Sequence, residues 1–284
     1  MAEDLTRRDF VSLSVAAGLA AAAGSAGAAE NVVEKDVEIK TPDGTCDAAF
    51  VHPASGSHAA VIIWPDAFGL RPTMRDFAKR LAADGYSVLV PNPFYRVSKA
   101  PQFGDISNFS FSNPADRSKL TPLMGSITAS GAAEKDAGAF VAWLDAQAQV
   151  NKSKKIGTQG YCMGGPLVFR TVASQPARVG AGASFHGGGL VTANPESPHL
   201  MIPKMKARLY VGIASNDDKS QPDAKDKLRD AFKAAGVPAE IEVYESLHGW
   251  CVPDMPNATP PIYNKAEAEK AWAKLVALYK TALA

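Results

Sequence analysis

The sequence predicts an α/β fold, a doubly wound and mostly parallel sheet with an N-terminal antiparallel hairpin. From residue 59 to the C-terminus, short apolar runs alternate with segments of helical periodicity, and this alternation requires parallel strands with helices on both faces. Ahead of it, apolar and polar side chains alternate over residues 32–40 and 46–52, on either side of turn residues 42–44. That pattern is typical of a hairpin.

Two apolar runs after the hairpin, residues 59–64 and 87–90, are predicted to be strands buried on both faces. A helix lies between them, because apolar side chains fall at helical spacing over residues 74–81 and Gly85 can end it. Residues 91–128 are rich in Pro, Asn and Ser and show no period. We expect this segment to be a lid or substrate loop.

The rest of the chain continues the alternation. Helices are predicted where apolar side chains share one face, and strands where apolar runs are short and uninterrupted. In chain order they are a helix at 132–149, a strand ending at Tyr161, a helix at 166–174, strands at 180–186 and 207–214, a helix at 222–235, a strand at 239–244 and a helix at 264–283.

The composition excludes some classes of function. The chain has 284 residues, and its 30 basic side chains are balanced by 29 acidic ones, so no global charge draws it to nucleic acid or to an anionic membrane. No cluster of His and Cys has the spacing of a metal site. We therefore expect one domain over residues 29–284, a small-molecule substrate, no metal or organic cofactor, and a monomer or homodimer.

Residues 1–28 resemble a twin-arginine export signal. The pair Arg7-Arg8 precedes an apolar run from Ser12 to Ala23, and small residues follow at 26–29. The run is rich in alanine and glycine rather than leucine, which favours a cleaved signal over a membrane-spanning helix. We expect the mature protein to begin near Ala29, to be periplasmic or secreted, and to have no membrane segment after cleavage.

Residues 155–165 read as a nucleophile elbow, a strand that turns sharply into a helix and presents its nucleophile at the turn. Gly160 and Gly164 stand two before and two after Cys162, where strand and helix crowd together and only small residues fit. Cys162 is the candidate nucleophile, and the N–H of Met163 is placed to meet a reacting oxygen. The alternative is a small buried cysteine in an ordinary turn.

An acid and a histidine follow the elbow, each just past a predicted strand. Asp217 and Asp218 come after residues 207–214, and His248 comes after residues 239–244. The order nucleophile, acid, histidine is that of α/β hydrolases. His248 can accept the thiol proton and one aspartate can orient its ring, although either aspartate alone is equally typical of a turn or a helix cap.

Together these residues resemble the dienelactone hydrolase family, cysteine-dependent α/β hydrolases that act on esters and lactones. The resemblance runs from about Val37 to Ala282. Its carriers are Val61-Ile62-Ile63-Trp64-Pro65-Asp66-Ala67-Phe68-Gly69, Asp84-Gly85-Tyr86, Pro91-Asn92-Pro93, Gly160-Tyr161-Cys162-Met163-Gly164-Gly165, Asn216-Asp217 and His248-Gly249-Trp250. It implies the α/β-hydrolase fold, a Cys162–His248–Asp217 triad with Asp217 preferred over Asp218, and an oxyanion hole from the N–H groups of Met163 and Ala67.

The resemblance also places a thiol-gating and substrate-binding region around the elbow. The family typically has a glutamate, which interacts with the resting thiol, where this chain has the shorter Asp66. The other residues assigned to this region are Phe68, Tyr161, Arg71, Arg117 and Trp250.

The dienelactone substrate itself is not predicted. Enzymes that open it hold its carboxylate with arginines, one of them shortly after the catalytic histidine, and residues 250–253 contain none. Arg71, Arg96 or Arg117 could substitute, because a guanidinium binds a carboxylate through two hydrogen bonds. An ester or lactone substrate is expected in either case.

Two further features lie outside the triad. His186 opens a His-Gly-Gly-Gly sequence that looks like the oxyanion motif of lipases, but it follows the strand after the elbow rather than the third strand. We interpret His186 as a structural or substrate-lining residue. If Cys162 is the nucleophile, Cys46 and Cys251 remain as a candidate disulfide pair.

The sequence thus predicts an exported ester or lactone hydrolase that works through an acyl-enzyme. Three alternatives stay open. The first is a thioesterase or acyltransferase with the same triad, whose acceptor and leaving group would be selected by the loop from Phe94 to Thr128. The others are a non-catalytic ligand-binding protein on this fold and a thiol-redox protein. The last is weakened by the lack of a resolving cysteine near Cys162.

Overall fold

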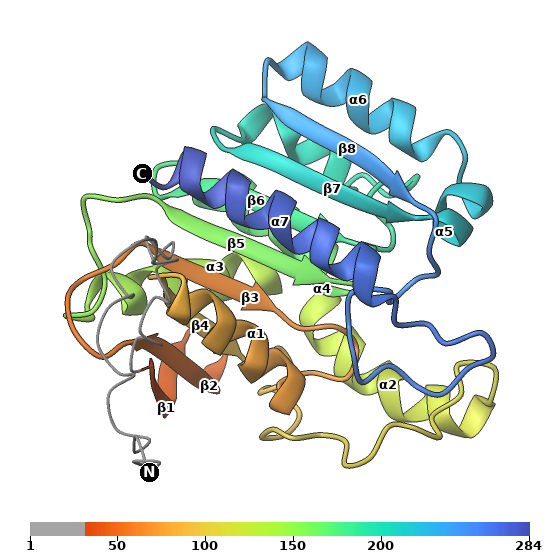
Figure 1. Ribbon diagram of the computed structural model, residues 1–284, viewed down its shortest axis with the longest axis horizontal. Coiled ribbons are helices and arrows are strands. Elements are labelled where there is room, and N and C mark those ends of the chain that lie inside the picture. The colour runs from red at the N-terminus through yellow and green to blue at the C-terminus, as the bar shows by residue number, and fades with distance from the viewer. Residues whose placement is uncertain (1–31) are drawn as a thin grey trace, which may run out of the picture.

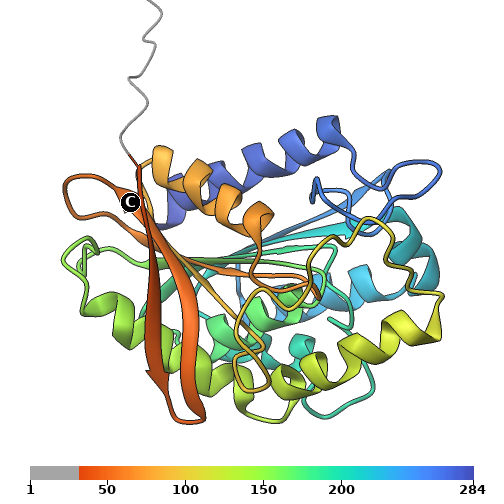
Figure 2. The same ribbon diagram turned by 90° about the horizontal axis from the view of Figure 1, so that it is seen from below.

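The computed structural model describes residues 32–284, so the predicted export signal lies outside the described residues. Eight strands form one sheet in the order β1-β2-β4-β3-β5-β6-β7-β8. Helices cover both of its faces (Figure 1, Figure 2). β1 pairs antiparallel with β2 and β2 with β4, whereas the pairs from β4 to β8 across the sheet are parallel. The predicted doubly wound sheet with its entering hairpin is confirmed.

The strands have the following bounds: β1 Val32–Thr41, β2 Gly44–Pro53, β3 Ala60–Trp64, β4 Ser87–Pro91, β5 Ile156–Tyr161, β6 Val179–Phe185, β7 Arg208–Ala214 and β8 Ala239–Tyr244. The helices are α1 Pro72–Ala83, α2 Pro114–Thr128, α3 Ala132–Asp145, α4 Gly164–Ser174, α5 Ser215–Ser220, α6 Ala224–Ala235 and α7 Lys265–Ala282, with a 3₁₀ helix η1 at Pro198–Lys204.

The core consists of two apolar layers, one on each face of the sheet. Successive residues of a strand point to opposite faces, so Val61 and Ile63 pack into the layer under α1 and α7, while Ile62 and Trp64 pack into the layer over α2, α3, α4 and α6. Figure 2 shows the sheet edge-on between these two groups of helices. Burial on both faces explains why β3, β4 and β5 read as continuous buried runs.

Three elements differ from the sequence prediction. The segment 91–128 is not a loop throughout, because it contains α2. The predicted helix at 132–149 ends at Asp145, and the helix predicted at 222–235 begins at Ala224 and is preceded by the short helix α5. Pro122 inside α2 hides its periodicity, but Pro114 at the first turn and the Asn113 side chain, which accepts from the Ala115 N–H, set its start.

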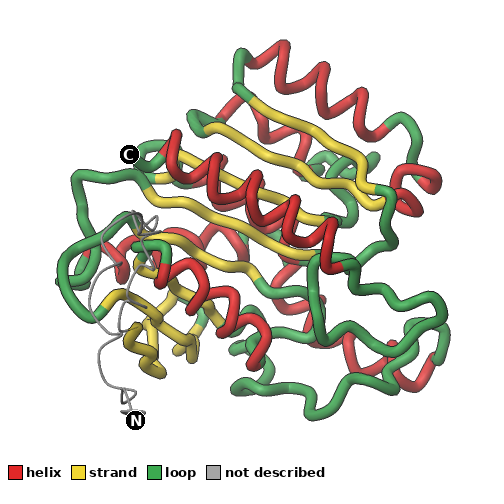
Figure 3. The backbone as a smooth tube through the Cα atoms, in the orientation of Figure 1, coloured by secondary structure: helices red, strands yellow, loops and turns green. Residues whose placement is uncertain are grey.

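The strand order reverses beside β3, since the chain runs from β3 to β4 on one side and later returns to β5 on the other. In such sheets sites form beyond the carboxyl ends of the strands at this switch point. Two long loops, 92–113 and 251–264, lie side by side at this end (Figure 1, Figure 3), and the Asn257 N–H donates to the Ser107 carbonyl at 2.9 Å. The two loops therefore enclose the end of the sheet where the predicted site lies.

Candidate active site

Cys162 lies at a sharp turn between β5 and α4, with a φ of 50°. This left-handed conformation is strained for a residue other than glycine and is found where the surroundings enforce it. A Cβ on Gly160 would overlap the carbonyl oxygen of Gly164, and a Cβ on Gly164 would overlap that of Trp64. The strand-turn-helix geometry and the glycine positions predicted from the sequence are therefore present.

Asp217 and His248 meet beside this turn. The Nδ1 of His248 lies 2.7 Å from Oδ2 of Asp217, and the His248 backbone N–H donates to Oδ1 of Asn216 at 2.8 Å. Asp217 stands in α5, directly after β7, so a regular element fixes its position. Asp218 points elsewhere and accepts two hydrogen bonds from Nζ of Lys225, at 2.7 and 2.9 Å. Of the two candidate acids, the structure brings Asp217 to the histidine.

The surroundings favour the charged form of His248. Burial lowers its pKa, but hydrogen bonds with the side chains of Asp217 and Cys162 outweigh burial and raise the pKa to about 10. The side chains of His248 and Asp217 are 27% and 30% exposed, so the pair is partly shielded from water. An imidazole held in this way is a strong proton acceptor next to the thiol.

The two predicted oxyanion donors start from the same level of the sheet, because Trp64 of β3 pairs with Gly160 of β5. Counted from these two paired residues, Ala67 and Met163 each lie three residues further along the chain. Within residues 32–284, the backbone N–H of Ala67 and of Met163 donates to no protein acceptor. Both groups are therefore free to donate to a substrate oxygen.

Asp66 is buried and holds Arg71 rather than the thiol. Its carboxylate accepts from Nη1 and Nη2 of Arg71 at 2.7 and 2.9 Å and from the Phe68 N–H at 2.9 Å. Arg71 also donates to both carboxylate oxygens of Asp254, at 2.8 and 2.9 Å. No hydrogen bond joins Asp66 to Cys162 in the described part of the chain. The gating role of Asp66 remains a prediction.

The other two candidate arginines lie apart from the elbow. Arg96 donates to the buried carboxylate of Asp136 at 2.7 and 2.8 Å and to Asp43 at 2.8 Å. Arg117 is exposed on α2. Arg71 and Arg96 thus already bind internal carboxylates.

The three aromatic residues assigned to substrate binding have different surroundings. Phe68 is buried, and the rings of Phe103, Phe109 and Phe111 from the loop 92–113 lie 5.6, 5.0 and 5.8 Å from it. This group, the phenylalanine cluster, reaches solvent through Phe111, which is 46% exposed. Phe68 thus connects the Ala67 turn to the loop that encloses the site.

Tyr161 and Trp250 lie deeper than predicted for residues that contact substrate. Tyr161 is buried, stacks on Phe185 and accepts a hydrogen bond from Nε2 of Gln159 at 2.8 Å. Trp250 is fully buried and stacks on Tyr244. Both residues therefore pack in the core beneath Cys162 and His248 rather than in a position to contact substrate.

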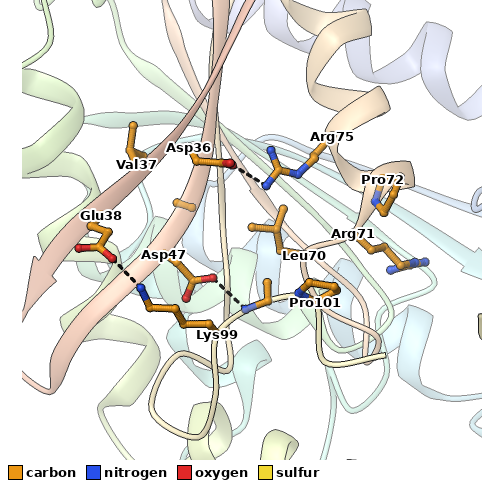
Figure 4. Close-up of a pocket in the computed structure, with 12 residues that line it drawn as sticks. Asp36, Val37, Glu38, Asp47, Leu70, Arg71, Pro72, Arg75, Lys99 and Pro101 are labelled. Atoms are coloured by element: carbon orange, nitrogen blue, oxygen red, sulfur yellow. Dashed lines mark hydrogen bonds and ion pairs between the residues drawn. The ribbon is translucent and has the colours of Figure 1, made fainter. Parts of the chain in front are cut away.

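A surface pocket of about 480 Å³ lies between the β1–β2 hairpin and the start of α1, and the triad residues do not line it (Figure 4). Its charges are paired with one another: Lys99 with Glu38 at 2.8 Å and Arg75 with Asp36 at 2.6 Å. We place the chemistry at the elbow, because neither Cys162 nor His248 lines this pocket.

Within the described residues, no group of three or more His, Cys, Asp or Glu side chains could hold a metal ion. No helix there is long and apolar enough to cross a membrane. The cysteines are free, and Cys46 and Cys251 belong to core layers on opposite faces of the sheet. The disulfide considered from the sequence is therefore not formed.

Sequence reasoning missed the roles of two contributors: Asn216 orients the backbone of His248, and Asp254 completes the Arg71 network. His186, predicted to be a structural or substrate-lining residue, contacts the elbow directly, with its Nδ1 3.1 Å from the backbone nitrogen of Cys162. The available signal for His186 was its place immediately after β6, at the same edge of the sheet as Cys162. The other two depend on side-chain directions that no local pattern records.

Comparison with known proteins identifies the family. Residues 46–283 match the Dienelactone hydrolase family. The chain belongs to this family. It is therefore a hydrolase of the ester and lactone class with the α/β-hydrolase fold, as the sequence predicted.

Individual relatives are distant but cover nearly the whole chain. A Methylorubrum extorquens protein is 25% identical over 284 residues, covering 95% of this chain and 91% of the relative. The carboxymethylenebutenolidase of Rhodococcus opacus is 26% identical and covers 85% of this chain and 88% of its own. A solved dienelactone hydrolase-like promiscuous phosphotriesterase from metagenomic libraries has a TM-score of 0.70 at 20% identity, covering 89% and 99% of the two chains. This last likeness concerns the fold alone.

Proposed function

We propose that this protein hydrolyses esters or lactones with an uncharged acyl group through a Cys162–His248–Asp217 triad and an acyl-enzyme intermediate. The observation that carries the proposal is the 2.7 Å contact of Asp217 with His248, next to a cysteine at a strained elbow. Family membership sets the reaction class. The triad and the charge of the substrate are inferences from the site.

The proposed reaction starts from an ion pair, in which the thiol proton of Cys162 has passed to Nε2 of His248. The thiolate attacks the carbonyl carbon, and the oxyanion is stabilised by the N–H groups of Met163 and Ala67. The imidazolium then protonates the leaving alkoxide as the C–O bond breaks, which leaves a thioester on Cys162. Water attacks the thioester with His248 as base, the acid is released and the thiol is restored. Asp217 keeps the Nδ1 proton in place and stabilises the imidazolium.

The surroundings of the elbow support an uncharged acyl group. Arg71 already contacts two carboxylates, those of Asp66 and Asp254. A substrate carboxylate would therefore find the guanidinium of Arg71 already paired, and burying an unpaired charge is costly. The phenylalanine cluster beside the Ala67 turn offers apolar contacts instead.

The surroundings of the other cysteines support hydrolysis over thiol-redox chemistry. Cys46 and Cys251 are both buried in the core, and burial raises the pKa of each thiol, to well above its usual value for Cys251. Thiols of this kind react slowly, because the thiolate is the reactive form. Neither is placed to resolve an oxidised Cys162.

Hydrolysis of p-nitrophenyl acetate and of a neutral δ-lactone by the wild type, Cys162→Ala and His248→Ala tests the proposal. We expect Cys162→Ala to be inactive and His248→Ala to lose on the order of 10³-fold in kcat. His58→Ala is the control and should match the wild type, because the hydrogen bond of the His58 side chain is to the Ser55 carbonyl and not to a triad residue. Full activity of Cys162→Ala would show that Cys162 is not the nucleophile and that the proposed triad is wrong.

We further propose that the protein is exported by the twin-arginine route, on the basis of Arg7-Arg8 and the apolar run that follows. Replacement of both arginines by lysine should retain the full-length chain in the cytoplasm of its host. Export of that variant at the wild-type level would contradict the proposal.

A further inference from the structure

His186 shares an unusual backbone conformation with the candidate nucleophile. Among residues 32–284, Cys162 and His186 are the residues other than glycine with a positive φ, at 50° and 40°. His186 directly follows β6, and its N–H donates to the Gly212 carbonyl of β7 at 2.8 Å. A left-handed residue of this size persists only where its surroundings hold it there, and such residues gather at functional sites.

The side chain of His186 accepts a hydrogen bond from the elbow itself. The backbone N–H of Cys162 is directed at Nδ1 of His186, at 3.1 Å, and at the Phe185 carbonyl, at 3.0 Å. An N–H can donate only to an unprotonated ring nitrogen, so the ring proton of His186 must be on Nε2. The side chain is 1% exposed, and burial together with the charge of His248 lowers its pKa well below the usual value. The ring is therefore neutral.

The same ring packs against the candidate base. The rings of His186 and His248 meet at 62° with centroids 4.9 Å apart, and those of His186 and Trp250 meet at 70° and 5.1 Å. His186 thus contacts the backbone of the nucleophile and the side chain of the base at the same time. Its Nε2 is buried and has no protein partner in the described part of the chain.

We propose that His186 is a positioning residue, whose neutral ring holds the backbone N–H of Cys162 and supports the His248 ring, so that thiol and imidazole keep a reactive geometry. The proposal rests on the Cys162–His248 chemistry proposed above. It assigns the essential contact to Nδ1 as a hydrogen-bond acceptor. It requires no contact between His186 and substrate.

Three substitutions separate this role from simple packing. His186→Asn keeps an acceptor near the Nδ1 position and tolerates a positive φ. His186→Leu has nearly the shape of asparagine but no acceptor. His186→Gly also lacks the acceptor but carries no backbone strain at this φ, so it controls for conformational cost. Thermal unfolding of each variant shows whether it is folded before kinetics are compared.

We expect His186→Asn to keep kcat within about threefold of the wild type, because one neutral hydrogen bond is retained. His186→Leu and His186→Gly should lose on the order of 10- to 100-fold in kcat with little change in KM, since misplacement of the reacting groups affects the chemical step. If a folded Leu or Gly variant is as active as the Asn variant, the proposal is wrong. If the Leu variant does not fold, the Asn and Gly pair decides.

A second measurement does not depend on turnover. With ¹⁵N-labelled histidine, NMR of the wild type should show an unprotonated Nδ1 and a protonated Nε2 for His186, and the Cys162 amide should exchange faster in the Gly variant than in the Asn variant. A protonated Nδ1 overturns the inference even if the hydrolase is active. An inactive wild type with this tautomer and exchange pattern would instead refute the proposed function and leave the contact in place.

Discussion

His248 is held between two groups that increase its affinity for a proton, the carboxylate of Asp217 and the sulfur of Cys162. Asp217 contributes by a short contact with Nδ1, which leaves Nε2 for the thiol. The neighbouring Asp218 has the same charge and almost the same position in the chain but binds Lys225. Comparing the two aspartates therefore shows whether His248 needs the contact with Asp217 or only a negative charge nearby.

We expect Asp217→Asn to reduce kcat by roughly 10²- to 10⁴-fold, because an amide favours the wrong tautomer of the imidazole and does not stabilise its charge. Asp218→Asn removes the same charge from the adjacent residue and should change kcat by less than about threefold. Steady-state kinetics on p-nitrophenyl acetate measure both. Equal losses in the two variants would show that the local charge, and not the contact, matters.

The raised pKa of His248 also predicts how stability changes with pH. The pKa is about 10 in the folded chain and about 6.5 in an unfolded one, so the folded state binds the proton more tightly. The stabilisation is fully present below pH 6.5 and is lost as the pH rises toward 10. In urea unfolding, the free energy of unfolding of the wild type minus that of His248→Gln should therefore decrease as the pH is raised from 6.5 to 10.

Comparison with His248→Gln is needed because other groups titrate in the same range. Buried tyrosines and the buried thiols of Cys46 and Cys251 are common to both proteins, so their contributions cancel in the difference. A difference that stays constant or grows between pH 6.5 and 10 would contradict the assignment.

At the scale of elements, Arg71 joins two loops that the chain separates widely. It stands just before α1, and it connects Asp66 in the turn after β3 to Asp254 in the loop after His248. Asp66 in turn accepts from the Phe68 N–H and so shapes the turn that contains Ala67. This network fixes the turn that contains Ala67 relative to the loop that follows the candidate base, His248.

Arg71→Met should destabilise the protein by about 3–5 kcal/mol, because it leaves the buried carboxylate of Asp66 without its partner. Arg75→Met is the matched control on the same helix. Arg75 pairs with Glu34 and Asp36 near the surface, and its loss should cost no more than about 1 kcal/mol. Chemical denaturation gives the free energy of unfolding of both variants. A loss for Arg71→Met as small as that for Arg75→Met would show that the Arg71 network does not stabilise the fold.

Local patterns sufficed for the elements that obey simple periodicity. The β8 bounds, the hairpin and the glycine-flanked elbow could be predicted because alternating side chains along a strand, and glycines at a crowded turn, leave a direct record in the sequence. α2 could not, since Pro122 interrupts its pattern and only three of its residues are buried. α5 is a single short turn of helix with no buried residue, so no apolar pattern marked it.

The site was predictable to a similar degree. Chain order after successive strands was enough to select Cys162, His248 and the pair of aspartates, because parallel strands bring their carboxyl ends to one edge. The partners of Arg71 and the direction of the His186 ring were not predictable. They depend on long-range packing, which brings together residues as distant as Arg71 and Asp254.

At the scale of the molecule, the sheet presents the candidate nucleophile, acid and base at one edge, and the loops 92–113 and 251–264 lie side by side at that end (Figure 1). These loops supply the exposed part of the phenylalanine cluster and Asp254, which pairs with the buried guanidinium of Arg71, and Arg71 also pairs with the buried Asp66. For the proposed function, we expect both features to disfavour a substrate carboxylate, the phenylalanine cluster by its low polarity and the Arg71 network by its excess of negative charge.

The last prediction follows from this arrangement. Between p-nitrophenyl pentanoate and the p-nitrophenyl monoester of glutaric acid, which differ mainly by a terminal carboxylate, we expect kcat/KM to favour the neutral ester by at least about tenfold. The selectivity should shrink as salt is added if repulsion from Asp66 and Asp254 causes it, and should persist if the apolar contacts of the phenylalanine cluster cause it.

Phe109→Ala tests the second cause: loss of the ring should raise KM for the neutral ester and leave KM for the anionic ester unchanged. A preference for the glutarate ester would show that a guanidinium leaves its internal partner to bind substrate, and Arg71 would then be the first candidate for that role.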